Sequence, residues 1–285
     1  MFQVQDLVTY GVWDFVVNVL IFAALAVPLF LLFWKFYKKK FQSRRIQSKP
    51  SNSTASIREE IKHSMVTLII FTLVDVLIYL AQLKGYTKIY TNVNDYGWPY
   101  LICSVLIIII LHDTIYYFLH RLMHHPKIYY IIHKVHHEST DPSPFAAFSF
   151  HPLEALLESI PYVIFAFLLP VHLVALWAWQ IIQITFNIIA HLGYEIYPKG
   201  FNTHWLFRFK TPSTHHNMHH AKVRGNYGLY FTWWDKIFKT EFPEYNQTYE
   251  ELQEKIAEGK TSNHHALKHI TDTPFKITEK TGTFS

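Results

Sequence analysis

Residues 112–137 read HDTIYYFLHRLMHHPKIYYIIHKVHH, and the rest of the chain is organised around this stretch. Seven of its 26 residues are histidines. Histidines three or four residues apart share one face of a helix, so their side chains can converge on one point. Two sets have that spacing: an H-x-x-x-H box of His120 and His124, and an H-x-x-H-H box of His133, His136 and His137.

The H-x-x-H-H pattern occurs again in THHNMHH, residues 214–220, as His216, His219 and His220. Neutral imidazole is the commonest transition-metal ligand among side chains, and imidazole-only sites suit iron, zinc or copper. The three boxes hold more imidazoles than one ion can coordinate, so they predict two ions. A loosely binding surface tract would be polar and low in complexity. Here tyrosine, phenylalanine, leucine and isoleucine are interleaved with the first two boxes, which indicates a packed site.

Apolar segments flank the histidine boxes, and half of the 285 residues are hydrophobic, which predicts a membrane protein. A helix of about 20 apolar residues crosses the ~30 Å core of a bilayer. The candidate spans are residues 11–34, 64–83 and 98–119, followed by an apolar pair, 155–170 and 172–190, broken at Pro170. The first of that pair is short enough to be re-entrant. We therefore expect an all-α polytopic membrane protein, with about four to five transmembrane or re-entrant helices and a histidine-rich helical cap.

A basic block predicts the orientation of these spans. Seven Lys or Arg and no acidic residue lie between Lys35 and Lys49, which is typical of a cytoplasmic segment under the positive-inside rule. The second span then runs outward and the third returns, so every histidine box is expected on the cytoplasmic side. Such a site suits a bacterial inner membrane or the endoplasmic reticulum. The block is not a groove interleaved with aromatic residues, so no nucleic-acid partner is expected.

We expect three regions along the chain. Residues 1–63 form an N-terminal transmembrane helix and a basic cytoplasmic linker, and residues 64–243 form the membrane-embedded catalytic domain. Residues 244–285 form a polar tail, with a short exposed helix at 249–258 and three histidines that are not ligands: His264, His265 and His269. The single cysteine, Cys103, lies in an apolar run, so neither a disulfide within the chain nor thiolate ligation is expected.

Further side chains are candidates for the metal site. His191 closes the apolar stretch before the last box and is a predicted ligand. Metal-bound histidines usually donate their other N–H group to an acceptor, and nearby carboxylates would offset the charge of the ions. The predicted outer contacts are Asp113, two helical turns before His120, with Asn187 and His215. Glu138 and Glu195 adjoin box residues, whereas His151 and Glu154 either line the site or make contacts at a helix start.

Three segments resemble the sterol desaturase / fatty acid hydroxylase superfamily, most closely the sterol C-5 desaturases. They are DTIYYFLHRLMHH (113–125), HKVHHESTDPSPFAAFSFHPLE (133–154) and HHNMHHAKVRGNYGLYFTWWDKIFKT (215–240). The similarity runs from about Leu101 to Thr240. It implies a non-haem di-iron enzyme that uses O₂ and two electrons to hydroxylate or desaturate a sterol-like or fatty-acyl lipid.

The resemblance also implies which residues act and which partners are needed. It makes the eight box histidines the catalytic metal ligands and matches His191 to a further family ligand. The eight are His120, His124, His133, His136, His137, His216, His219 and His220. No cytochrome b5 domain is fused at either end, so electrons are expected from a separate cytochrome b5-like or ferredoxin-like protein.

Two other classes of function remain open at this point. A histidine-rich membrane zinc hydrolase would need a general base and an open coordination position, but no electron donor. A metal transporter would place its ligands near the middle of the membrane, whereas these boxes lie at the ends of spans. Dependence on O₂ and on a reductant separates the two enzyme classes.

Overall fold

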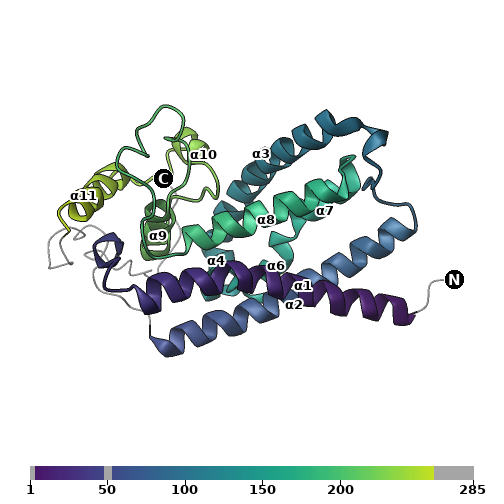
Figure 1. Ribbon diagram of the computed structural model, residues 1–285, viewed down its shortest axis with the longest axis horizontal. Coiled ribbons are helices and arrows are strands. Elements are labelled where there is room, and N and C mark those ends of the chain that lie inside the picture. Colours follow the sequence, from purple (N-terminus) through teal and green to yellow (C-terminus); the bar gives the residue numbers. More distant parts are fainter. Residues whose placement is uncertain (1–3, 48–52, 260–285) are drawn as a thin grey trace.

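The computed structural model describes residues 4–47 and 53–259, where the chain is helical and forms isolated β-bridges but no strand (Figure 1). Four helices there are long and apolar enough to cross a membrane: α1 (Val4–Leu29) with its continuation to Phe36, α2 (Thr54–Leu83), α3 (Gly97–Met123) and α8 (Leu173–Ala190). The predicted all-α polytopic fold is therefore confirmed, and the chain is an integral membrane protein.

The first span is longer than the predicted 11–34, and it ends in a π-helical segment, Phe30–Phe36. Pro28 explains the change, because proline has no N–H group for the helical ladder and crowds the preceding turn. The second span begins ten residues before the predicted Ser64. Ser53 caps it by accepting a hydrogen bond from the Ser56 N–H, and its first turns carry charged residues that the predicted span left out.

The apolar stretch 155–170 is not one helix. It divides into α6 (Pro152–Glu158) and α7 (Ile160–Leu168), with Pro161 in the first turn of α7. The nine residues of α7 cover only about 14 Å, less than half of a bilayer core of about 30 Å. This segment is therefore not one of the four candidate spans.

Short helices form a cap at the end of the bundle where α1 and α8 finish (Figure 1). They are α4 (Pro126–Ile132), α5 (Lys134–His137), α9 (Ser213–Lys222), α10 (Trp233–Ile237) and α11 (Tyr245–Ala257), with a 3-10 turn at Gln42–Arg44. A second 3-10 turn, Val93–Asp95, lies in the connection between α2 and α3, and a third, Pro144–Phe148, packs against α2 and α8. The prediction that the helix at 249–258 is exposed was wrong. Tyr245, Tyr249 and Leu252 of α11 are buried against Ile46 and Met218. The predicted tail histidines at 264, 265 and 269 lie outside the described residues.

The basic segment after α1 is built into this cap. Arg45 is buried and forms an ion pair with Asp141, which is also buried, and its guanidinium lies 4.0 Å from the ring centroid of Trp34. The Ile46 N–H bonds to the Gly193 carbonyl at 3.2 Å. A side chain at Gly193 (φ +76) would meet the Arg45 guanidinium at 2.5 Å, so glycine is needed there. The basic end of α1 is thus fixed to the end of α8.

Candidate metal centre

The nine predicted ligands are buried and gather in two groups. Five have one ring nitrogen each within 4.8 Å of the others: His120, His124, His133, His137 and His219. A second group has the same property: His136, His191, His216 and His220. The first group joins the end of α3 to α5 and α9, and the second joins α5 and α9 to the end of α8.

Each H-x-x-H-H box contributes to both groups. His133 and His137 belong to the group of five, whereas His136 belongs to the group of four. The box on α9 divides the other way, because His216 and His220 join the group of four and His219 the group of five. Helical residues four apart point in nearly the same direction, but consecutive residues diverge by about 100°. The adjacent histidines of each box therefore reach different centres.

Hydrogen bonds fix which nitrogen of several rings is available. The Nδ1 atoms of His120, His191 and His219 lie 2.7–2.8 Å from the carbonyl oxygens of Tyr227, Asn187 and Gly225, respectively. A carbonyl oxygen only accepts, so these Nδ1 atoms carry the proton and each Nε2 of a neutral ring keeps a free lone pair. The Nε2 of His219 is buried and makes no hydrogen bond within the described structure. These rings present acceptors to the interior of the groups.

The distances between Nε2 atoms fit a shared ion. His120 and His133 are separated by 3.1 Å, and His191 lies 3.0 Å from His220 and 3.1 Å from His216. Two imidazoles bound to one ion at about 2.1 Å would be about 3.0 Å apart at a right angle and about 3.4 Å apart at a tetrahedral angle. Where both nitrogens keep lone pairs, a cation between them is the arrangement that relieves their repulsion. The residues present therefore fit two metal ions.

The surroundings keep these imidazoles neutral, as ligands must be. Burial, and to a smaller extent the neighbouring imidazoles, lowers the pKa of His133, His137 and His220 well below its usual value. A neutral ring is the form that binds metal.

The carboxylate that contacts a predicted ligand is Glu154. Its Oε1 lies 2.7 Å from Nδ1 of His133, and both side chains are buried. Glu154 belongs to the first turn of α6, and His151 caps that helix by accepting from the Leu153 N–H at 3.3 Å. Both alternatives for this segment are therefore realised, one by each residue. The Glu154–His133 pair is an outer contact of the kind that orients metal ligands.

The other predicted outer contacts are engaged elsewhere. Asp113 accepts from the N–H groups of Tyr230 and Phe231 and, at 2.7 Å, from the indole of Trp233, so it ties α3 to the start of α10. The Asn187 side chain donates to the Ala147 carbonyl, and only the Asn187 backbone oxygen meets a predicted ligand.

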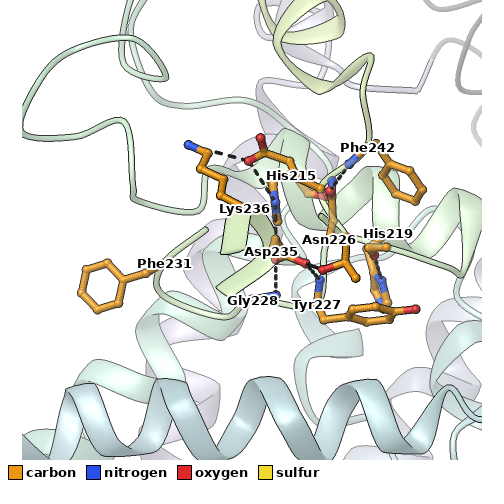
Figure 2. Close-up of polar contacts among 12 residues, drawn as sticks. His215, His219, Asn226, Tyr227, Gly228, Phe231, Asp235, Lys236 and Phe242 are labelled. Carbon is orange, nitrogen blue, oxygen red and sulfur yellow. Dashed lines mark hydrogen bonds and ion pairs between the residues drawn. The ribbon is translucent and has the colours of Figure 1, made fainter. Parts of the chain in front are cut away.

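Three further candidates also lie apart from the histidine groups. His215 lies 3.9 Å from an oxygen of Asp235 (Figure 2). Glu195 caps α9 by accepting from the N–H and hydroxyl groups of Thr214, and Glu138 is exposed beside Lys134.

Sequence reasoning did not single out Asp235, which shapes the turn behind two ligands. Its carboxylate accepts from the N–H groups of Tyr227 and Gly228 at 2.9 and 2.8 Å (Figure 2). That turn supplies the Tyr227 carbonyl for His120 and the Gly225 carbonyl for His219. A side chain at Gly228 would come within 2.2 Å of the backbone, so the turn requires glycine. The only local sign of this role was an acidic residue within the aromatic segment TWWDKIF (232–238).

A cavity lies between α1, α2, α7 and α8, beside the group of four. Apolar side chains such as Ile21, Leu68 and Ile184 form much of its wall. None of the described residues that line the cavity is a predicted ligand. Phe150 lines it, however, and the Phe150 ring lies 5.1 Å from the ring of His136. The cavity therefore ends one aromatic ring away from the candidate metal centre.

These features define a membrane protein with two buried groups of imidazoles that could bind metal. The sequence profile of the fatty acid hydroxylase family matches residues 105–240. The Delta(7)-sterol 5(6)-desaturase of Gibberella zeae is 35% identical over 228 residues, which cover 77% of this chain and 68% of that protein. The chain therefore belongs to the fatty acid hydroxylase family, a family of iron enzymes, as the predicted resemblance implied.

Two further relatives are oxidoreductases by name. Lathosterol oxidase of Rattus norvegicus is 36% identical over 184 residues, covering 64% of this chain and 60% of that protein. Methylsterol monooxygenase 1 of Danio rerio is 38% identical over 152 residues, covering 53% and 51%, respectively. No solved structure matches the chain. The protein is accordingly a membrane oxidoreductase of the lipid hydroxylase and desaturase type, which removes the hydrolase and transporter alternatives.

Proposed function

We propose that this chain is a di-iron enzyme that hydroxylates or desaturates a sterol-like lipid, and that its two histidine groups each hold one iron. The observation that carries the proposal is the division of nine buried imidazoles into a group of five and a group of four. Iron bound there would supply the activation of O₂ that, with two electrons, oxidises an unreactive C–H bond.

The protein contributes orientation and exclusion of water. Carbonyl oxygens of Tyr227, Gly225 and Asn187 hold three rings in the tautomer that exposes Nε2. Glu154 holds the His133 ring in the same way through its carboxylate. Because all nine imidazoles are buried, water is largely excluded from the oxidation site.

The relatives and the cavity support the choice of substrate. The named relatives act on Delta(7)-sterol, lathosterol and methylsterol, and the cavity between the spans has both apolar and polar side chains in its wall beside the candidate centre. We infer that a lipid enters it from the bilayer, with a fatty-acyl lipid as the alternative. Electrons would come from a separate cytochrome b5-like or ferredoxin-like protein on the cytoplasmic side.

Iron content tests the proposal directly. Protein purified from iron-replete cells should contain about two iron ions per chain, because each of the two groups has enough imidazoles to hold one ion. Elemental analysis alongside an oxidation assay with O₂ and reductant is the measurement. One ion per chain, or zinc alone in a protein active without O₂, would contradict the di-iron proposal.

Reporter fusions test the proposed cytoplasmic face. Because the basic segment and the histidine groups lie at the same end of the bundle, reporters at Ser51 and after Ser285 should both be cytoplasmic. A reporter at Asn92, in the connection between α2 and α3, should lie on the opposite side. Finding Asn92 and Ser285 on one side would refute this orientation.

A further inference from the structure

The cavity has two polar regions, and they differ in how their groups are bonded. In the first, α1, α2 and α8 bring polar side chains together inside the membrane. Asn18 donates to Asp14 at 2.9 Å and accepts from Gln180 at 2.9 Å, and Thr72 also donates to Asp14. These groups satisfy one another, so this region needs no ligand to complete its hydrogen bonds.

The second polar region is the carboxyl of Glu158, the last residue of α6. It lines the cavity, and within residues 4–47 and 53–259 it forms no hydrogen bond or ion pair. The candidate metal centre does not engage it either, because Glu154 makes the contact with His133. Glu158 is partly buried, so its carboxyl loses some of its contact with water without gaining a partner, and that loss is costly. A hydrogen-bond partner bound in the cavity would remove that cost.

We propose that Glu158 binds a hydroxyl group of the lipid substrate and thereby sets which part of the lipid faces the metal centre. This inference rests on the proposed function and deepens it, because it assigns a residue that positions the sterol-like substrate by its hydroxyl group.

The position of Glu158 on α6 supports this positioning role. Glu158 follows Glu154 by one helical turn, a displacement of about 6 Å along the axis. Since Glu154 is in contact with His133, a hydroxyl held at Glu158 is close to the candidate centre. A compact ring system bearing a hydroxyl can then present carbons a few bonds away. A long acyl chain with its only polar group at the far end cannot use this contact in the same orientation.

The electrostatic state of the carboxyl favours a neutral group over a cation. Burial raises the pKa of Glu158 to about 8. At neutral pH the carboxyl is therefore mostly protonated, and it can both donate to and accept from a hydroxyl.

Binding of two matched probes tests the inference without turnover. Lathosterol and its 3-methyl ether differ in one hydroxyl hydrogen and a methyl group, and quenching of Trp177 and Trp179, which line the cavity, reports occupancy. The iron-loaded full chain, without reductant, should bind lathosterol roughly 10-fold or more tightly than the ether. In Glu158→Leu the ratio should fall to about one, whereas Glu158→Gln should keep part of it, because an amide still bonds a hydroxyl.

Gln183→Leu is the matched control, because Gln183 also lines the cavity and is polar. It should keep the wild-type ratio, and all variants should keep the iron content. Loss of the ratio in Gln183→Leu but not in Glu158→Leu would overturn the assignment, as would equal binding of both probes by the wild type. A wild type that prefers lathosterol but oxidises no lipid would support the inference while contradicting the proposed function. If Glu158→Leu does not fold, an unchanged ratio in Glu158→Gln and Glu158→Ala also overturns it.

Discussion

Replacing His136 by alanine is expected to abolish lipid oxidation while leaving membrane insertion intact. His136 is one of only four imidazoles in its group, and its Nε2 lies 3.3 Å from that of His191. Loss of a ligand should exceed the 10–100-fold effect typical of an outer contact, so turnover should fall by more than about 100-fold. Iron content should fall from about two ions per chain toward one, because the group of five remains complete.

Two variants serve as comparisons for the effect of His136→Ala. Glu154→Gln removes only the carboxylate behind His133, and it should lower activity by about 10–100-fold with a smaller loss of iron. His63→Ala, on the polar first part of α2 and outside both groups, should change neither quantity. Equal losses in His63→Ala and His136→Ala would mean that general stability, and not metal ligation, explains the effect.

Replacing Asp141 by alanine is expected to cause a large loss of stability. The change leaves Arg45 buried without its carboxylate, at 3% exposure, beside the rings of Trp34 and Tyr194. Removing one partner of a buried ion pair typically costs about 3–5 kcal/mol. For a domain of this size that cost corresponds to a melting temperature lower by roughly 6–20 °C, measured by thermal unfolding in detergent.

A double variant and an exposed pair serve as controls. Arg45→Met combined with Asp141→Leu should recover much of the stability, because no uncompensated buried charge remains. Lys62→Ala breaks the pair with Glu59, in which both side chains are more than half exposed, and it should leave the melting temperature unchanged. A wild-type melting temperature for Asp141→Ala would show that the Arg45–Asp141 pair does not hold the basic segment to the cap.

The helical spans and the family were predictable because both depend on patterns within short stretches of sequence. An apolar run long enough to cross a bilayer is recognisable without knowing its neighbours, and so is a box of histidines at helical spacing. Departures occurred where packing between distant segments decides. The helix at 249–258 has a polar sequence, yet Tyr249 and Leu252 are buried because Ile46 and Met218 lie against them.

The outer contacts show the same limit. Asp113 lies on the correct helix face for a contact with His120, but its carboxylate instead accepts hydrogen bonds from the N–H groups of Tyr230 and Phe231. Glu154 reaches His133 instead, although it lies 21 residues away in sequence. Spacing along one helix restricts which residues share a face, but it does not identify the distant segment that packs against that face.

The sequence by itself determined that eight histidines occur in three boxes with spacings suited to metal ligation, and that a ninth, His191, closes an apolar stretch. Only the tertiary structure decided how they divide. A helix fixes His136 and His137 in directions about 100° apart. Which group each joins depends on where α9 and the end of α8 present His216, His191 and His219. That arrangement follows from contacts between segments far apart in sequence, such as the Arg45–Asp141 pair and the turn held by Asp235, and no local pattern encodes it.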